Sequence, residues 1–514
     1  MVKQLREISS LTNPPIPFTS LITIIITTLI TCCRPFITTV EGVIGINWGR
    51  QTTHRLIPSM VVDLLLQNDI HHLKLSSPSD NVLKAFASSG ISVTVTLPNE
   101  GIQNIKHPNM ARYYLQEKVR RYQNQNVNIT CILVGSEPFS TYYRPETYQT
   151  APDALRLIQE AIPANGYGNL IATIPHFTDV LIPTTTKPSE ADFKPELKDK
   201  MVQIIRLLNR TNAPFVMHMF PIYSAINHSD WNPEFSFIDN KSNFTIVDDN
   251  GLVYRNIFEF VYDSFLHAIA KAGSPGLQLS VGKIGWPTDG FPGANIPNAE
   301  RFFREFLPYI KSNKGTPLRP GISIDVFIHT LADENKNRVD ISAFQRHWGI
   351  YWTNGQPKYK IDFTGQGRDI YPTTAKGIIR MPKRWCIFNN NIQNLTLVKF
   401  WVNHTCTLSD CTTLSPGGSC SHLDYNMNVS YAFNQFFQVK AQSNKEGNTC
   451  DFDGLGVVVP NDPSIGTCKF PVEILAAEKV DKYGLNGAYG GFRYNIRGFF
   501  CGSTMLLFFL LRLI

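Results

Sequence analysis

The sequence has no long run of lysine or arginine, and its long uncharged apolar runs lie only near its two ends. The formal net charge is +7, but without a basic cluster nothing indicates a nucleic-acid partner. The lack of internal apolar runs excludes a membrane protein with several spans. Charged residues make up 17% of the chain and hydrophobic residues 43%, which excludes a disordered or coiled-coil chain. The 514 residues allow one large domain and an accessory piece.

The first apolar run predicts export. Between Glu7 and Arg34 the chain carries no charge, and residues 21–33 (LITIIITTLITCC) are apolar or threonine, apart from the two closing cysteines. This length suits the central region of a secretory signal better than a membrane span, so residues 1–40 are predicted to be a signal peptide. An uncleaved N-terminal anchor is the alternative.

The second apolar run, residues 499–514 (FFCGSTMLLFFLLRLI), ends the chain. It follows a polar stretch with Arg493 and Arg497, which in turn follows the small residues 486–488 (NGA). This order is typical of a GPI-attachment signal, with Asn486 as the attachment residue and 487–514 as the removed propeptide. We therefore expect the chain on the outer face of the plasma membrane. A short membrane helix or an ordinary apolar tail is the alternative.

Eight N-x-S/T motifs agree with export, because such motifs accept N-linked glycans in secreted chains. They begin at Asn128, Asn209, Asn227, Asn240, Asn243, Asn394, Asn403 and Asn428.

Six of the ten cysteines fall within 83 residues: Cys386, Cys406, Cys411, Cys420, Cys450 and Cys468. An even number in a short exported segment predicts a disulfide-stapled module over residues 385–470, although the sequence alone leaves the pairing open. Zinc is the alternative, but no C-x2-C pair occurs, and we expect no metal. Cys131 stands alone on a predicted buried strand and is expected to be an inert core thiol. Cys32, Cys33 and Cys501 fall in the predicted signal and tail.

Residues 43–371 repeat one pattern, in which a β-branched run is followed by an amphipathic helical stretch such as 58–69 or 81–90. The eight runs are 43–48, 72–75, 91–97, 131–137, 170–174, 215–220, 277–286 and 322–331. Alternating strands and helices predict a parallel sheet, and eight units predict an α/β fold of the (β/α)8 TIM-barrel type. A doubly wound open sheet competes, but no G-x-G-x-x-G follows the first run. A linker over 372–384 and a spacer over 471–486 flank the module.

Two strand ends carry the residues of chemical interest. The fourth run ends in VGSEPF (134–139), which contains Glu137, and the seventh ends in VGKIGWPTDG (281–290), which contains Lys283. Strands four and seven face each other across a barrel mouth, at the end where barrel enzymes do their chemistry. A retaining glycosidase needs two carboxyl groups there, and this chain has one carboxyl and one amine.

The chain resembles plant endo-1,3-beta-glucanases of glycoside hydrolase family 17. The matching text is IGINWG (44–49), VGSEPF (134–139), ADFKPEL (191–197), VGKIGWPTDG (281–290), RHWGIYW (346–352) and PKYKID (357–362). WCIF at 385–388, CTLSDC (406–411), SYAFNQFFQ (430–438) and CDFDGLG (450–456) extend the resemblance to the callose-binding module of the family's long, GPI-anchored form, carbohydrate-binding module family 43. It implies a (β/α)8 barrel and a small α+β module that both act on 1,3-beta-glucan.

Position by position, the resemblance also implies roles. Glu137 takes the position of the proton donor, and Glu334 is retained as a substrate-binding acid. Ser136 stands where the family has an asparagine that binds the sugar 2-hydroxyl. Lys283 stands where the family has its glutamate nucleophile.

Further departures surround these positions. Gln345 replaces a glutamate, residues 218–221 (HMFP) replace N-x-Y-P, and residues 76–77 (SS) replace an aromatic residue and an acid. We expect Phe220 and Trp286 to bind sugar. Trp48, Trp348 and Tyr351 either line the mouth or pack in the core.

Within the module, the resemblance implies the disulfides Cys386–Cys450, Cys406–Cys411 and Cys420–Cys468. The aromatic residues Tyr431, Phe433, Phe436 and Phe437 either stack on sugar or pack, and their helical spacing favours packing for most of them.

The expected function is binding of callose-type 1,3-beta-glucan in the cell wall with weak or no hydrolysis, because an ammonium at position 283 cannot act as the anionic nucleophile. A neutral Lys283 acting as nucleophile would tend to form a dead-end adduct. An active retaining endo-1,3-beta-glucosidase is the first alternative, and a structural wall glycoprotein is the second. The chain is expected to be a monomer without a cofactor.

Overall fold

A computed structural model of the chain describes residues 41–76, 78–141, 145–183, 186–227, 230–391, 393–441 and 449–475. The predicted signal peptide, the attachment residue Asn486, the propeptide 487–514 and Cys32, Cys33 and Cys501 lie outside these ranges. No helix within them is long and apolar enough to cross a membrane.

The larger part of the chain is built on a parallel sheet, whose strands follow the order β5-β4-β3-β2-β1-β11-β10-β7-β6. The strands are β1 (Ile44–Trp48), β2 (His72–Leu75), β3 (Ser92–Leu97), β4 (Asn128–Val134), β5 (Ile171–Thr173), β6 (Pro175–Phe177), β7 (Phe215–His218), β10 (Leu279–Ile284) and β11 (Val326–Ile328). The two ends of this order, β5 and β6, are separated along the chain by Ile174 alone. One kinked strand therefore pairs with β4 on one side and β7 on the other, and closes the sheet into a barrel.

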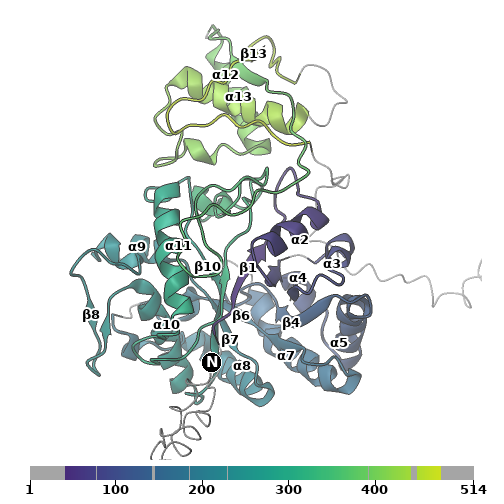
Figure 1. Ribbon diagram of the computed structural model, residues 1–514, viewed down its shortest axis with the longest axis vertical. Coiled ribbons are helices and arrows are strands. Elements are labelled where there is room, and N and C mark those ends of the chain that lie inside the picture. Colours follow the sequence, from purple (N-terminus) through teal and green to yellow (C-terminus); the bar gives the residue numbers. More distant parts are fainter. Residues whose placement is uncertain are drawn as a thin grey trace, which may run out of the picture. The chain divides into compact units, whose positions relative to one another are not determined.

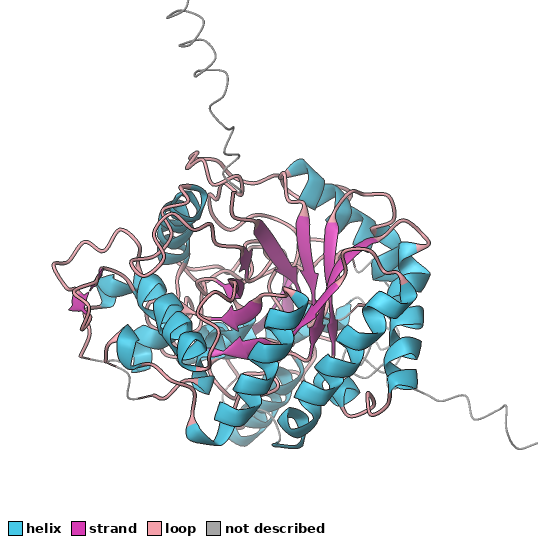
Figure 2. Ribbon diagram, turned by 90° about the horizontal axis from the view of Figure 1, so that it is seen from below, coloured by secondary structure: helices cyan, strands magenta, loops and turns pink. Residues whose placement is uncertain are grey.

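Helices surround the strands, as Figure 2 shows in cyan and magenta. They are α2 (Pro58–Gln67), α3 (Asp80–Ala85), α4 (Asn99–Ile102), α5 (Pro108–Leu115), α6 (Arg121–Gln123), α7 (Pro145–Asn165), α8 (Lys198–Thr211), α9 (Pro221–Asn227), α10 (Ile257–Lys271) and α11 (Ile296–Lys311). Asn256 and Asn295 cap α10 and α11 by accepting hydrogen bonds from backbone N–H groups of the first turn. The predicted (β/α)8 barrel is confirmed.

The strands are buried on both faces, as parallel barrel strands are. On β3, Val93, Val95 and Leu97 are at most 1% exposed, and the alternate residues Thr94 and Thr96 are buried as well. This is why continuous β-branched runs, without alternation, marked the strands in the sequence.

Three details differ from the expected pattern. The helical stretch predicted over 81–90 ends at Ala85, because Ser88 and Gly90 take positive φ and turn the chain into β3. After β11 the first helical element is a 3-10 turn over Ala343–Arg346. A small antiparallel hairpin, β8 (Ile246–Val247) and β9 (Val253–Tyr254), extends from the segment before α10.

The C-terminal module pairs β12 (Trp385–Phe388) antiparallel with β13 (Gly456–Val459) and packs α12 (Leu395–Leu408) and α13 (Tyr425–Ala441) with them (Figure 1). Its disulfides are Cys386–Cys450, Cys406–Cys411 and Cys420–Cys468, the pairs that the resemblance implied. They stabilise a module too small for a large core.

Candidate active site

A left-handed turn after β4 presents Glu137 at the barrel mouth. Gly135 has φ +90° and Glu137 has φ +55°, a region that a residue with a side chain rarely adopts. The Asn99 side chain fixes this turn, since its Oδ1 accepts from the Ser136 N–H at 2.8 Å and its Nδ2 donates to the Ser136 carbonyl at 3.0 Å. Ser136 therefore contributes backbone groups that hold Glu137 in place.

A bulge near the end of β10 presents Lys283. The register with both neighbouring strands shifts between Val281 and the end of β10, so the pairing is locally interrupted at Gly282. Buried Asn47 on β1 anchors the bulge by donating its Nδ2 to the Gly282 carbonyl at 3.1 Å and to the Ile328 carbonyl at 3.0 Å. Position 282 has room only for glycine, since a Cβ there would lie 2.7 Å from His218 Nε2.

Four side chains from four strand ends meet in one hydrogen-bonded row. Lys283 Nζ lies 3.0 Å from Glu137 Oε1, and His218 Nδ1 lies 2.5 Å from the same oxygen. Lys74 Nζ lies 3.0 Å from His218 Nε2 and donates to the Gly282 carbonyl at 2.5 Å. The expected meeting of strands four and seven is therefore observed, and β2 and β7 add Lys74 and His218.

The protonation of His218 follows from its neighbours. Burial, followed by the charges of Lys74 and Lys283, holds the pKa of His218 well below its ordinary value, so the ring is neutral. An ionised Glu137 has no proton to give, so the single ring proton is on Nδ1 and is donated to Glu137. Nε2 then accepts from Lys74.

Glu137 receives two donors on one oxygen. Burial by itself would raise its pKa, but the charge of Lys283 and the hydrogen bond from His218 outweigh burial and hold the pKa of Glu137 well below its usual range. A general acid must carry a proton at working pH. In this arrangement Glu137 is an ionised acceptor.

The pKa values of Lys74, in the row, and of His329, next to it, are both strongly lowered. Burial, then repulsion from Lys283, lowers the pKa of Lys74 far below its ordinary value. His329, just beyond the end of β11, has its pKa lowered well below the ordinary value by burial and by the charges of Lys283 and Lys74.

Glu334 lies on the loop after β11 and is buried. Its Oε1 accepts from the backbone N–H of Gln51 at 2.9 Å, and its carboxyl group packs against Gly49, where a Cβ would lie within 2.1 Å of that oxygen. Burial raises the pKa of Glu334. Glu334 thus links the β1 and β11 loops of the mouth, and a role in sugar binding stays a prediction.

The aromatic residues expected to bind sugar are mostly enclosed by protein. Trp286 is 4% exposed, stacks on Phe237 with ring centroids 4.6 Å apart, and contacts Phe302. Phe220 is 9% exposed and packs on Trp348 at 4.5 Å. These low exposures leave little of either ring surface for stacking on a sugar, and their predicted role in sugar binding stays a prediction.

Three further aromatic residues considered for the mouth are in the core as well: Trp48 is 4%, Trp348 2% and Tyr351 0% exposed. Of the two roles considered for them, these burials favour packing. Gln345 joins this packing, since its Nε2 donates to the Tyr223 hydroxyl and its Oε1 accepts from Trp348 Nε1.

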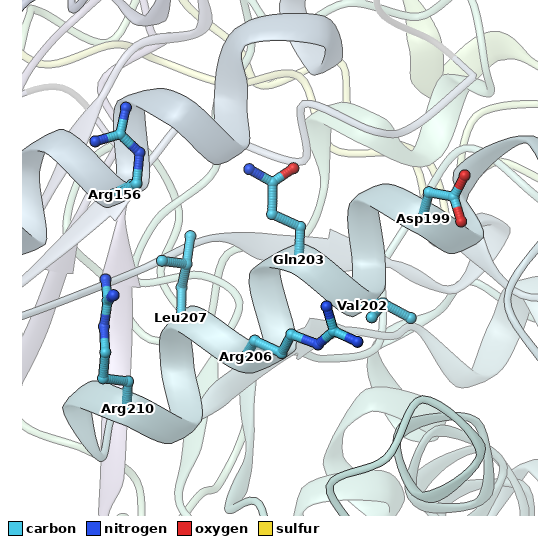
Figure 3. A pocket seen from close by; sticks show the side chains of 7 residues that line it. All are labelled: Arg156, Asp199, Val202, Gln203, Arg206, Leu207 and Arg210. Carbon is cyan, nitrogen blue, oxygen red and sulfur yellow. The ribbon is translucent and has the colours of Figure 1, made fainter.

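A separate groove of about 580 Å³ lies on the outer helices, with Arg156 on α7 and Arg206, Leu207 and Arg210 on α8 (Figure 3). None of its lining residues belongs to the row around Glu137. The groove is therefore not part of the candidate active site.

The glycosylation motifs differ in how accessible their asparagines are. Asn128, Asn209, Asn243, Asn394 and Asn403 are exposed. Asn240 uses its Nδ2, the atom that carries a glycan, to donate to the Phe244 and Arg255 carbonyls, and Asn428 donates to the Leu423 carbonyl. The Asn227 side chain lies outside the described part of the chain. The first five positions are the better acceptors.

Most of the other singled-out side chains lie in the interior, whereas Cys131 and Phe436 are partly exposed. In the module, Tyr431 is 3%, Phe433 0% and Phe437 7% exposed, and Phe436 packs against Phe452, as the predicted packing requires. Burial raises the pKa of the Cys131 thiol to about 12, which agrees with an inert thiol.

Lys74 was not predicted to be part of the site. The sequence shows Lys74 only as a lysine within the apolar strand HLKL (72–75). A single lysine in such a strand does not indicate whether its side chain points into the barrel. His218 was noticed only as a departure from a motif, although a histidine at a strand end was available as evidence.

Comparison with known proteins agrees with this architecture. Residues 44–363 match the family model "Glycosyl hydrolases family 17", and residues 384–457 match "X8 domain". The chain is 36% identical to Glucan endo-1,3-beta-glucosidase 8 and 38% identical to Glucan endo-1,3-beta-glucosidase 5, both of Arabidopsis thaliana. The first alignment covers 84% of this chain and 90% of the relative, and the second covers 85% and 89%.

A solved structure shares the barrel. CJP38, a beta-1,3-glucanase and allergen of Cryptomeria japonica pollen, is 28% identical with a TM-score of 0.58, and the match covers 62% of this chain and 99% of that one. With the family model matching most of the chain, the protein is a member of glycosyl hydrolases family 17.

Proposed function

We propose that this chain binds 1,3-beta-glucan of the cell wall and hydrolyses it poorly or not at all, as a pseudoenzyme of its family. The observation that carries the proposal is the 3.0 Å ion pair between Lys283 and Glu137. Its relatives' names, glucan endo-1,3-beta-glucosidase 8 and 5, support the ligand class.

The ion pair opposes double displacement in two ways. Retaining hydrolysis needs a carboxylate nucleophile about 5–5.5 Å from the acid, and an ammonium can neither attack as an anion nor stabilise the positive charge that develops on the sugar ring. The same ammonium keeps Glu137 ionised, so the leaving-group oxygen has no proton donor. Loss of either function alone would slow the reaction strongly.

The test compares the natural chain with Lys283→Glu on a soluble linear 1,3-beta-glucan and on the insoluble polymer. We expect the natural chain to bind the insoluble polymer and to release no reducing ends. We expect Lys283→Glu to regain some hydrolysis, because the second carboxyl group both attacks and raises the pKa of Glu137.

A matched variant is Lys283→Gln, which removes the ammonium without supplying a nucleophile and should stay inactive. Because Ser136 and Gln345 also differ from the family, Lys283→Glu is expected to recover only part of the activity. Hydrolysis by the natural chain would support the active-enzyme alternative, and failure to bind either polymer would support a purely structural wall protein.

The proposed location is the outer face of the plasma membrane, next to the wall, through a GPI anchor. The apolar ends and small residues 486–488 motivate this location. A phospholipase specific for phosphatidylinositol should release the chain from intact cells, and retention after treatment would contradict the anchor.

A further inference from the structure

Helix α12 of the C-terminal module carries an exposed aromatic group made of Phe400, Trp401 and His404, here named the α12 aromatic surface. Phe400 is 57% exposed. Its ring is within 14° of parallel to the ring of His404, with centroids 6.2 Å apart. Residues four positions apart lie on the same helix face, and both Phe400 and His404 are exposed there as a stacked pair.

Trp401 braces this surface from the protein side. Its Nε1 donates to Asp453 Oδ2 at 3.0 Å, and its ring packs edge-on against Phe452 at 5.5 Å. Phe400 in turn packs edge-on against Trp401 at 5.2 Å. The exposed ring is therefore held in one orientation before any ligand binds, which lowers the entropic cost of binding.

The other aromatic residues of the module do not offer such a surface. Tyr431, Phe433 and Phe437 are buried. Tyr425 on α13 is 46% exposed, but within the described ranges it has no aromatic partner.

We infer that the α12 aromatic surface is where the module binds a 1,3-beta-glucan chain, an inference that rests on the proposed function. Large exposed apolar groups on a small soluble module mark a binding surface. The ligand is expected to be neutral, because the two acid or base residues nearest in contact or sequence have opposite formal charge: Asp453 accepts from Trp401, and Lys399 precedes Phe400. The apolar faces of pyranose rings fit flat aromatic rings, and the segment belongs to the X8 domain.

A glycan of the chain itself is the competing occupant. Asn403 begins an N-x-T motif, is exposed, and lies one position before His404 and three after Phe400. A glycan attached there would start on the same helix face and would cover the two rings. The Asn403→Gln variant removes this occupant and separates the two cases.

The experiment measures depletion of the purified chain by insoluble linear 1,3-beta-glucan. The variants are Phe400→Ala, Phe400→Tyr and the matched control Tyr425→Ala, each with and without Asn403→Gln, and the melting temperature of each is recorded. Truncation of an aromatic residue that anchors a ligand commonly lowers the affinity strongly. Phe400→Ala is therefore expected to weaken the apparent affinity about tenfold. Phe400→Tyr keeps the ring and should bind like the natural chain, as should Tyr425→Ala.

Unchanged binding by Phe400→Ala in the Asn403→Gln background would overturn the inference while leaving the proposed function intact. If Phe400→Ala lowers the melting temperature only when Asn403 is glycosylated, the surface is covered by the chain's own glycan instead. If the chain that carries only Asn403→Gln does not bind the polymer at all, the proposed function is contradicted, and the inference that rests on it is contradicted as well.

Discussion

At the scale of single residues, one oxygen decides the chemistry. Glu137 Oε1 receives hydrogen bonds from both His218 and Lys283, so the carboxyl group that we propose at the acid position is stabilised without its proton. Under the proposed function, Lys283 affects two catalytic roles, because it stands at the predicted nucleophile position and keeps Glu137 ionised.

The same contact predicts a pH effect on stability in Lys283→Met. At pH 7 the variant should lose about 1 to 3 kcal/mol of unfolding free energy, less than a fully buried broken pair, because the His218 hydrogen bond remains and the pair is 15–17% exposed. In the natural chain the pKa of Glu137 is lowered on folding, so its stabilising contribution is present above the unfolded value of about 4.3 and is lost as the pH falls through the folded value.

In Lys283→Met the pKa of Glu137 should be higher than in the natural chain, because the charge of Lys283 no longer lowers it. The variant should therefore lose less unfolding free energy than the natural chain when the pH falls. The stability difference between the two proteins should therefore shrink from pH 7 to pH 3, as measured by urea unfolding. Lys106→Met, which removes an exposed lysine, serves as the control for the change in net charge. A difference that stays constant or widens on acidification would contradict the proposed ion pair.

At the scale of elements, the site depends on how β10 is fastened to its neighbours. Asn47 on β1 donates to the carbonyls of Gly282 and Ile328, and so joins β1, β10 and β11 at the mouth. The Gly282 carbonyl also accepts a hydrogen bond from Lys74 Nζ at 2.5 Å, so Asn47 shares this buried acceptor with Lys74.

Asn47→Ala is expected to destabilise the barrel by about 1 to 3 kcal/mol, because it removes buried hydrogen bonds to the Gly282 and Ile328 carbonyls, of which Gly282 keeps its bond from Lys74. The measurement is urea unfolding monitored by circular dichroism. The control is Asn124→Ala, which changes an exposed asparagine and should stay within about 0.5 kcal/mol of the natural chain. Equal unfolding free energies of the two variants would show that the Asn47 hydrogen bonds do not stabilise the barrel.

The elements were largely predictable from the sequence, and the contacts within the site were not. Continuous β-branched runs predicted the strands because barrel strands are buried on both faces, and the convergence of strand ends predicted that Glu137 and Lys283 would meet. The break at Ile174 was not predictable, because a kink leaves the hydrophobic pattern unchanged.

Side-chain direction explains what was missed in the site. Lys74 joined the row because its side chain points into the barrel, and pattern alone does not assign a direction on a strand that is buried on both faces. Trp286 was expected to bind sugar, but it packs on Phe237, a residue from a distant segment. The position of such partners depends on tertiary packing rather than on local sequence.

At the scale of the whole molecule, two sugar-directed parts share one chain. If the barrel mouth and the module both bind 1,3-beta-glucan, binding of one raises the local concentration of polymer at the other, and retention on an insoluble polymer exceeds that of either part alone. This advantage does not need hydrolysis. The proposed role as a wall-binding protein is therefore consistent with an altered catalytic row and a retained disulfide-stapled module.

The proposal that the natural chain hydrolyses 1,3-beta-glucan poorly or not at all is tested most directly by measuring the reducing ends released from the linear polymer. The purified natural chain and Glu137→Gln are measured in parallel. The Gln variant removes the only candidate acid of the Lys283 row, so any activity that it shares with the natural chain comes from a contaminant. We predict that the two proteins release equal, background amounts. Release by the natural chain that Glu137→Gln abolishes would contradict the account.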